Sequence, residues 1–288
     1  MKISGTLLSV LSLFSMSLAP LLNKYALVSL NWCWGAALSS LFCFLIAAVA
    51  KPSEFRELVR SRFDVSKPLV FIALTNSLGL LCQYGAVAQL EPATLSILGR
   101  MYVVFAIVLA QVFLRERCAR AEYIVLTCVL TGAGLFCWTA NFRGNALGIT
   151  LCLAYCFFFA LTHLQIKIET SRSSANKILL TNNLVTAVVL IPVAFACAGS
   201  LHDASFQTIS LIAGAAFFGQ WLGLLLFYES LKRIPMVKAN LIRSFSPIVG
   251  VAVTYPFFPV ILSRIQVIGA SVMIFALVTQ AVFRRVSA

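Results

Sequence analysis

Acidic residues are scarce in this sequence: nine Asp and Glu stand against 22 Lys and Arg, and charged residues make up only 11% of 288. A soluble domain carries about 25% charged residues. With 61% hydrophobic residues and a mean hydropathy of +0.97, the chain is predicted to be a multi-span membrane protein. The chain has a net charge of +13, and most of its basic residues lie between apolar runs. Membrane orientation therefore explains that charge better than nucleic-acid binding, and no nucleic-acid partner is expected.

Motifs for binding metals and nucleotides are also missing. The sequence has two histidines, no Cys-x-x-Cys, no His-Glu-x-x-His and no Gly-rich phosphate loop. These absences exclude the common zinc sites and ATP-driven transport within this chain. The nine cysteines are interpreted as small apolar residues that fill helix interfaces. No cofactor or metal is expected.

Long apolar runs divide the chain into ten candidate membrane spans. Each is close to the roughly 20 residues that a helix needs to cross a bilayer. The runs are 3–23, 25–50, 68–90, 92–114, 123–142, 144–166, 178–201, 204–228, 235–258 and 265–283. The polar segment 51–67 is predicted to form a short amphipathic surface helix. The first run is long for a signal-peptide core and lacks an obvious cleavage site, so we expect it to stay in the mature chain.

The positive charges predict how the chain is oriented. Of the 22 Lys and Arg residues, only Lys24, Arg143 and Arg264 fall between runs on one side of the membrane. Arg100 and Arg243 lie deep inside runs, and all others fall on the opposite side. Positive charge in short loops marks the cytoplasmic side. The sequence therefore predicts a multi-pass protein of the inner cell membrane with both termini in the cytoplasm.

Unusual residues recur at an offset of 143 positions. Five runs lie in each half, so the second half enters the membrane from the opposite side. Inverted repeats are a feature of secondary transporters, whose substrate site lies near the midplane between the halves. We therefore predict an all-α integral membrane fold of ten transmembrane helices in two inverted five-helix repeats, residues 1–142 and 143–288. The matched pairs are Gly5 and Gly148, Lys24 and Lys167, Pro92 and Pro235, and Arg100 and Arg243.

The fourth run of each half carries a family resemblance. The segments are "LEPATLSILGRMYVVFAIVLAQVFLRER" (90–117) and "RIPMVKANLIRSFSPIVGVAVTYPFF" (233–258). They resemble the drug/metabolite transporter superfamily, in particular its EamA-like transporters, through the helix start at Pro92, the mid-helix Pro247 and the terminal Glu116. The first half has Val104 in place of the mid-helix proline, and the second has Pro259 in place of the terminal glutamate. The resemblance implies ten helices in two inverted repeats.

Two arginines interrupt the apolar runs, each eight residues after the proline that starts its helix. At 1.5 Å per residue, Arg100 and Arg243 lie about 12 Å along their helices, near the middle of a hydrocarbon core about 30 Å thick. An arginine there costs roughly 2.5–3.5 kcal/mol and usually faces a cavity or a partner. All nine acidic residues lie in loops or near helix ends, with Glu229 the nearest candidate partner. We expect the arginines to contact an anionic substrate; the alternative is bonding to helix carbonyls or polar neighbours.

Other polar residues inside the runs are weaker candidates for the wall of a cavity. Each either contacts substrate or forms hydrogen bonds between helices. His163 is either a pH-sensitive gate or a hydrogen-bonded packing residue. The predicted substrate-binding residues are Arg100, Arg243, Asn240, Tyr84, Gln83, Trp221 and His163.

These features predict a secondary transporter, an exporter or exchanger, that moves a small anionic or zwitterionic metabolite by alternating access. We expect it to work as a monomer in the lipid bilayer. A broad-specificity drug/metabolite efflux carrier and, less favoured, a scaffold without transport activity remain as alternatives. A cation exporter would need a carboxylate near the midplane, and a lipid-modifying enzyme would need clustered His or acidic residues. The sequence offers neither.

Overall fold

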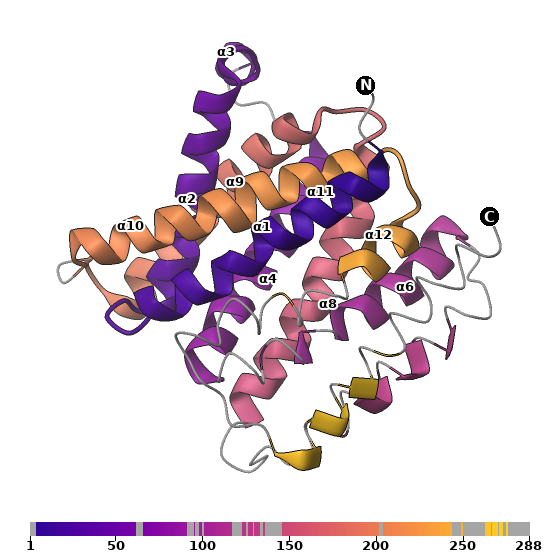
Figure 1. Ribbon diagram of the computed structural model, residues 1–288. Helices are drawn as coiled ribbons and strands as arrows, with labels where there is room; N and C mark the ends of the chain where they lie inside the picture. Colours follow the sequence, from indigo (N-terminus) through magenta and orange to yellow (C-terminus); the bar gives the residue numbers. More distant parts are fainter. Residues whose placement is uncertain are drawn as a thin grey trace.

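The computed structural model of the chain describes a bundle of helices (Figure 1). It describes residues 4–61, 66–90, 95, 98–99, 101–116, 123–124, 126–128, 130–132, 135, 146–201, 204–243, 249, 263–265, 267–269, 271–272 and 275.

Six helical spans are long and apolar enough to cross a membrane, and they confirm six of the predicted runs. They are α1 (Gly5–Ala26), α2 (Trp32–Ala50), α4 (Lys67–Gln89), α8 (Ala146–Glu169), α9 (Ala175–Ala198) and the continuous span made of α10 (Phe206–Ala215), the π-helix η1 (Ala216–Gly223) and α11 (Leu224–Leu231). The fourth and ninth runs contain the helices α6 (Met101–Leu114) and α12 (Met236–Arg243). The fifth and tenth runs contain short described helical stretches. The predicted count of ten also depends on parts of these four runs that lie outside the described residues.

Local capping explains where several helices begin. Polar side chains just before the first turn accept hydrogen bonds from its backbone N–H groups at 2.9–3.2 Å. These bonds satisfy donors that every helix start leaves open. The cap at Asn31 accounts for a helix that begins at Trp32, later than the predicted start of that run at residue 25. The capping residues are Ser4, Asn31, Ser174 and Ser205.

The helices pair across the two halves of the chain. α4 packs along α8, α2 packs along α9, and α1 packs along α10, η1 and α11. α6 packs on α8, while α12 packs on both α1 and α6. Large apolar side chains such as Val28 and Phe206 are exposed, as expected for surfaces that meet lipid.

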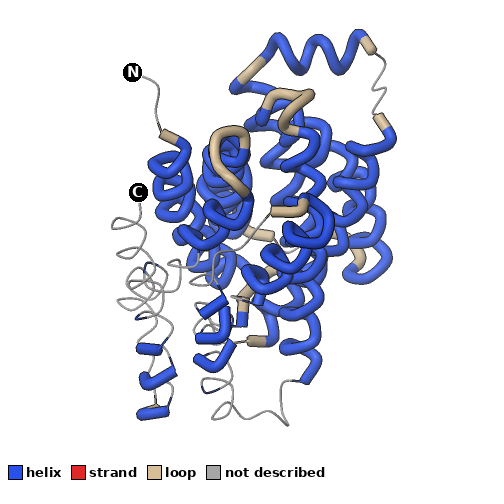
Figure 2. Tube along the Cα trace, turned by 90° about the vertical axis from the view of Figure 1, so that its right-hand side faces the viewer, coloured by secondary structure: helices blue, strands red, loops and turns tan. Residues whose placement is uncertain are grey.

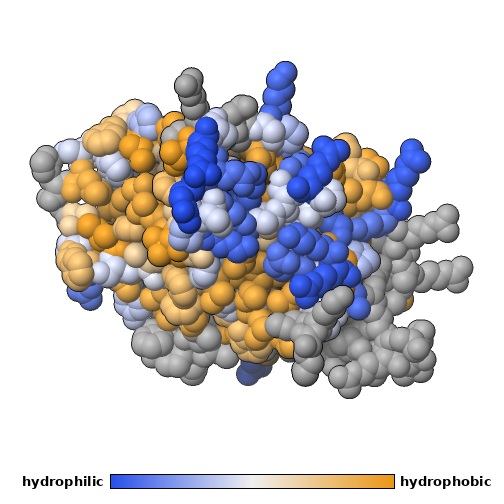
Figure 3. All heavy atoms as spheres, turned by 90° about the horizontal axis from the view of Figure 1, so that it is seen from above, coloured by the Kyte–Doolittle hydropathy of each residue, from blue (hydrophilic) through white to orange (hydrophobic). Residues whose placement is uncertain are grey.

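The predicted surface helix in segment 51–67 is confirmed as α3 (Pro52–Arg60). It lies across the end of the bundle (Figure 2), where hydrophilic side chains gather (Figure 3). Its Leu58 is buried against α2 and α9. Glu54 accepts hydrogen bonds from Ser174 Oγ at 2.7 Å and from Asn176 Nδ2 at 2.8 Å. The helix is therefore tied to the start of α9.

Lys24 and Lys167 make equivalent contacts with helix ends. Each ammonium group donates hydrogen bonds to two backbone carbonyls at the end of a neighbouring span, α4 for Lys24 and α11 for Lys167. A positive charge complements the negative end of the helix dipole. The acceptors are Val87 O at 3.0 Å and Leu90 O at 3.2 Å for Lys24, and Leu231 O and Ile234 O for Lys167. The two lysines are one of the pairs matched in the sequence.

Candidate functional site

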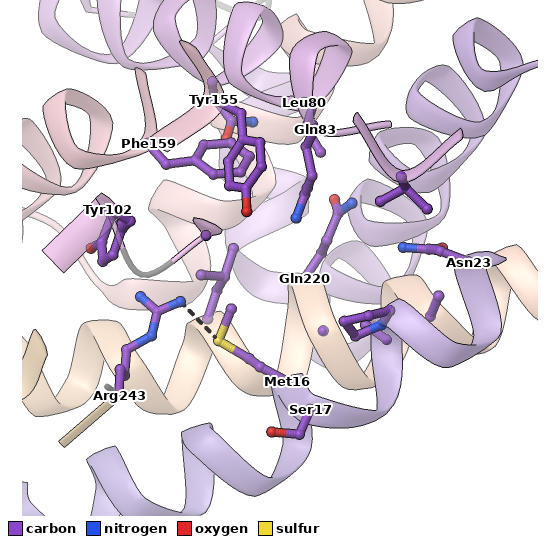
Figure 4. Close-up of a pocket in the computed structure, with 18 of the residues that line it drawn as sticks. Met16, Ser17, Asn23, Leu80, Gln83, Tyr102, Tyr155, Phe159, Gln220 and Arg243 are labelled. Atoms are coloured by element: carbon purple, nitrogen blue, oxygen red, sulfur yellow. Dashed lines mark hydrogen bonds between the residues drawn. The ribbon is translucent and has the colours of Figure 1, made fainter. Parts of the chain in front are cut away.

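A cavity of about 200 Å³ lies among the helices (Figure 4). Water occupies about 30 Å³ per molecule in the liquid, so the space suits a small metabolite. Its walls come from α1, α4, α6, α8, α9, α10, η1, α11 and α12, together with Leu95 and Gly99. The polar lining residues are Ser17, Asn23, Asn76, Gln83, Tyr102, Tyr155, His163, Asn182, Asn183, Gln220 and Arg243.

Among the described residues that line this cavity, the charged one is Arg243. None of the described residues that line it is acidic. Glu229, the nearest acidic candidate in the sequence, lies instead 2.9 Å from Lys232 Nζ and 3.9 Å from Arg233 Nη2. The described lining therefore favours a negatively charged group over a cation.

Arg243 reaches the cavity between aromatic rings. Its guanidinium carbon lies 4.3 Å from the ring centroid of Phe227 and 5.3 Å from that of Tyr102. Its Nη2 donates to Met16 Sδ at 3.4 Å. Cation–π contacts contribute roughly 0.5–2 kcal/mol and offset part of the cost of holding an arginine inside a membrane. A carboxylate or phosphate is bound by the N–H groups along the edge of the guanidinium plane.

A hydrogen-bonded row of side chains stands beside the arginine. The Tyr102 hydroxyl donates to Asn240 Oδ1 at 2.8 Å and lies 2.7 Å from His163 Nδ1. Since the single hydroxyl proton goes to Asn240, His163 donates from Nδ1. Asn240 Nδ2 in turn donates to Met236 O at 3.0 Å. The row fixes α12 against α6 and α8, one turn before Arg243.

Glu116 holds the start of α12. Its carboxylate oxygens accept hydrogen bonds from Met236 N at 3.0 Å and Val237 N at 3.1 Å. A carboxylate at a helix N-terminus satisfies open backbone donors and complements the helix dipole. The glutamate that follows the fourth run therefore positions the helix that carries Arg243.

The π-helix η1 forms another wall of the cavity. In a π-helix each carbonyl accepts from the backbone N–H five residues on instead of four, and two carbonyls of η1 also accept hydrogen bonds from hydroxyl groups of α1. Ser12 Oγ donates to Gly223 O at 2.7 Å, and Ser15 Oγ donates to Phe218 O at 2.6 Å. Short π-helical stretches are frequent at functional sites. The serines of the first run therefore hold η1 in place.

Gly219 lets η1 approach α1 closely. A Cβ atom at this position would lie 2.5 Å from the Cβ of Ala19, which is too close for any larger residue. The next residue, Gln220, lines the cavity. Its Nε2 donates to Ser39 Oγ on α2 at 2.9 Å. The close contact therefore sets the depth at which Gln220 enters the cavity.

The structure brings three of the predicted substrate-binding residues together. Arg243, Gln83 and His163 all line the cavity, from α12, α4 and α8. Arg100, the predicted partner of Arg243, lies outside the described residues.

Three further predicted residues lie behind the lining. Asn240 is fully buried behind Tyr102. Tyr84 is also buried, and its hydroxyl donates to Asn23 Oδ1 at 3.1 Å. Trp221 Nε1 donates to Asn176 Oδ1 at 3.3 Å. These contacts support the positions of lining side chains and helix ends.

Several lining residues were not singled out from the sequence. They are mostly uncharged, and an isolated Asn or Tyr inside an apolar run is a weaker signal than an arginine. The adjacent pair in run 178–201 and the asparagine next to Lys24 were the available signals. The residues concerned are Asn23, Tyr102, Tyr155, Asn182 and Asn183.

Comparison with known proteins points to a family of membrane transporters. The family model of the EamA-like transporter family matches residues 3–138 and again residues 146–280. The pseudopaline exporter CntI of Pseudomonas aeruginosa, in strains UCBPP-PA14 and PAO1, is 27% identical over 194 residues. That alignment covers 66% of this chain and 66% of the exporter, just under two thirds of its length. A solved crystal structure matches 99% of both chains with a TM-score of 0.75 and 12% identity, which shows a shared fold.

Proposed function

Because the chain belongs to the EamA-like transporter family, we propose that it is a secondary transporter of a small anionic or zwitterionic metabolite that works by alternating access. The family and the six apolar spans make it a multi-pass membrane protein. The observation that carries the choice of substrate is Arg243, which lines a cavity without acidic side chains among its described residues. Arginine binds carboxylate and phosphate groups through two parallel hydrogen bonds.

Two five-helix repeats, residues 1–142 and 143–288, are the moving parts in this proposal. The double match of the family model supports them, as do the equivalent contacts of Lys24 and Lys167. The helix pairs support them too. In the proposed repeat α1 corresponds to α8, and α4 corresponds to the span that ends in α11. The packing of α4 on α8 is therefore matched by the packing of α11 on α1. Rocking of one repeat against the other would open the cavity to each side in turn.

Aromatic and amide groups in the cavity lining could bind the ammonium group of a zwitterionic substrate. The rings of Tyr155 and Phe159 face the cavity, and aromatic faces attract ammonium groups. Carboxamide oxygens of Asn and Gln accept hydrogen bonds from the same groups. An amino acid or organic acid therefore fits this lining better than a lipophilic cation.

Export or exchange across the inner cell membrane is the proposed direction of transport. The relative from Pseudomonas aeruginosa is named as an exporter, and this supports net efflux. The distribution of Lys and Arg supports cytoplasmic termini. The proposed unit is a monomer, because each chain carries both repeats.

Transport into liposomes tests the proposal. Purified protein is reconstituted, and exchange of labelled amino acids, organic acids and sugar phosphates is measured. We expect at least one anionic or zwitterionic compound to exchange, and Arg243→Gln to reduce its rate at least about tenfold, the loss of one charged hydrogen bond. Arg60→Gln removes the same charge from the exposed side of α3 and is the matched control. Unchanged exchange by Arg243→Gln would contradict the role of the arginine.

A broad-specificity efflux carrier is the second candidate. The apolar part of the lining, which includes Met16, Leu80 and Phe159, favours it. Export of structurally unrelated neutral dyes, unaffected by Arg243→Gln, would support this alternative. A scaffold without transport activity is less favoured, because it has no need of a polar cavity inside the bundle.

A further inference from the structure

Three carboxamide side chains meet in one part of the cavity. They are Asn23 from α1, Gln83 from α4 and Gln220 from η1. Figure 4 shows their tips turned toward the same space, with Arg243 on the other side of the cavity. We name these three residues the carboxamide cluster. Because each comes from a different helix, the cluster exists only in the assembled bundle.

Two members of the cluster have a fixed hydrogen-bonding sense. The Tyr84 hydroxyl donates to Asn23 Oδ1 at 3.1 Å, which fixes the orientation of this amide and leaves the two protons of Nδ2 for a ligand. Ser39 Oγ donates its own proton to Ala36 O at 2.9 Å, and it must therefore accept from Gln220 Nε2. This leaves Gln220 Oε1 for a ligand. The cluster thus presents a donor and an acceptor at set positions.

Gln83 is the third member of the cluster, and no hydrogen bond within the described residues fixes where its amide oxygen and nitrogen point. Within the described part of the chain, no hydrogen bond engages its side chain, which is partly exposed to the cavity. Rotation about the last side-chain bond exchanges its oxygen and nitrogen. It can therefore donate to or accept from whatever lies between Asn23 and Gln220.

We infer that the carboxamide cluster binds a substrate group that both donates and accepts hydrogen bonds, a hydroxyl or a primary carboxamide, while Arg243 binds the anionic end. A carboxylate has no proton for Gln220 Oε1, an ammonium has no lone pair for Asn23 Nδ2, and an alkyl end leaves both unpaired. The inference rests on the proposed function. It narrows the substrate to small organic anions that carry a hydroxyl or amide away from the acid group.

Binding of matched acids to the purified protein in detergent tests this inference. The probes are straight-chain carboxylic acids of three to six carbons, each as the plain acid, the terminal hydroxy acid, the terminal amide and the dicarboxylic acid. Thermal stabilisation is titrated to obtain each dissociation constant. We expect the hydroxy acid or the amide of at least one length to bind at least about tenfold more tightly than the plain acid, because a site built for hydrogen bonds rejects analogues that lack them. Equal affinities at every length would overturn the inference.

Variants separate the cluster from the arginine. Gln220→Leu removes the fixed acceptor and should remove most of the preference for the hydroxy acid or amide while plain acids still bind. Gln83→Leu breaks no hydrogen bond within the described residues, so it is expected to fold, and it should weaken the same preference. Gln111→Leu, on α6 outside the cavity lining, is the matched control. A preference unchanged in both Gln220→Leu and Gln83→Leu would overturn the inference while leaving the proposed function intact, provided Arg243→Gln still weakens binding of all the acids by at least about tenfold. Failure of every acid to bind would overturn both.

Discussion

Tyr102 and His163 share a hydrogen bond of 2.7 Å at the wall of the cavity. The same tyrosine hydroxyl donates to Asn240 Oδ1, so a single oxygen joins α6, α8 and α12. Arg243 follows Asn240 on α12, with its guanidinium 5.3 Å from the Tyr102 ring centroid. The tyrosine therefore positions the arginine both through its hydroxyl and through its ring.

Removing that hydroxyl should destabilise the bundle. In Tyr102→Phe the ring stays, but His163 Nδ1 and Asn240 Oδ1 lose their shared partner in a buried place. Removing one partner of a buried hydrogen bond costs about 1–3 kcal/mol, and the midpoint of thermal unfolding in detergent should fall accordingly. Tyr123→Phe is the control, because the Tyr123 hydroxyl is exposed and accepts from Gln111 Nε2. Equal midpoints for the two variants would show that the buried bonds contribute nothing.

The two helix-end lysines should matter equally if the halves are repeats. Lys24→Met and Lys167→Met each leave two carbonyls of a span end without their charged donor. Hydrogen bonds to charged groups contribute about 1.5–3 kcal/mol, so both variants should unfold at lower temperature. Lys51→Met, whose side chain is 52% exposed, should change little. A large loss for one lysine and none for the other would contradict their equivalence.

The membrane spans were the most predictable part of this fold. Lipid cannot satisfy backbone N–H and C=O groups, so an apolar run of sufficient length has to be helical. Composition alone therefore located α1, α2, α4, α8, α9 and the span from Phe206 to Leu231. The surface helix α3 was predictable for a related reason, because a polar segment between two spans has to lie at the interface.

The cavity was harder to predict, because the sequence does not show how each helix is rotated. Successive residues on a helix point about 100° apart. Gln83 lines the cavity, whereas its neighbour Tyr84 is buried behind the wall. Gln220 also lines it, whereas Trp221 turns to Asn176 on α9. The π-helix changes the turn at this point, and no feature of the sequence indicated it. The position of Arg243 at the cavity was predictable because a charged side chain inside a membrane span faces the interior of the bundle or a water-filled cavity.

Acid should loosen the attachment of α3 to α9. Burial alone would raise the pKa of Glu54, but hydrogen bonds from Asn176 and Ser174, together with Lys51, outweigh it and hold this pKa below its ordinary value. A lowered pKa in the folded state means that the carboxylate stabilises the fold above its ordinary pKa, and that this contribution is lost as the pH falls through the folded value. The thermal midpoint of the wild type should therefore fall more between pH 6 and pH 3 than that of Glu54→Gln.

Glu57→Gln provides the control for this pH dependence. Glu57 lies on the same helix, and its side chain is 64% exposed where it meets Lys177. Its replacement should leave most of the fall in the midpoint in place, because exposed ion pairs contribute little. If Glu54→Gln loses as much stability in acid as the wild type does, the carboxylate of Glu54 is not the group responsible.

The contact between Gly219 and Ala19 should be sensitive to a single methyl group. In Gly219→Ala the new Cβ would lie 2.5 Å from Ala19 Cβ, so η1 has to move away from α1, and overpacking of this kind costs about 1–3 kcal/mol. Gly214→Ala is the matched control on the same span. Its Cβ would lie 3.5 Å from Leu22 Cδ1, an ordinary contact, and alanine in a helix is favoured over glycine by roughly 0.5–1 kcal/mol. Thermal unfolding should therefore move down for Gly219→Ala and stay level or rise for Gly214→Ala. Since the shift of η1 also displaces Gln220, exchange activity in liposomes should fall for the first variant alone. Wild-type stability and exchange in Gly219→Ala would mean that the close approach of η1 to α1 does not position the cavity wall.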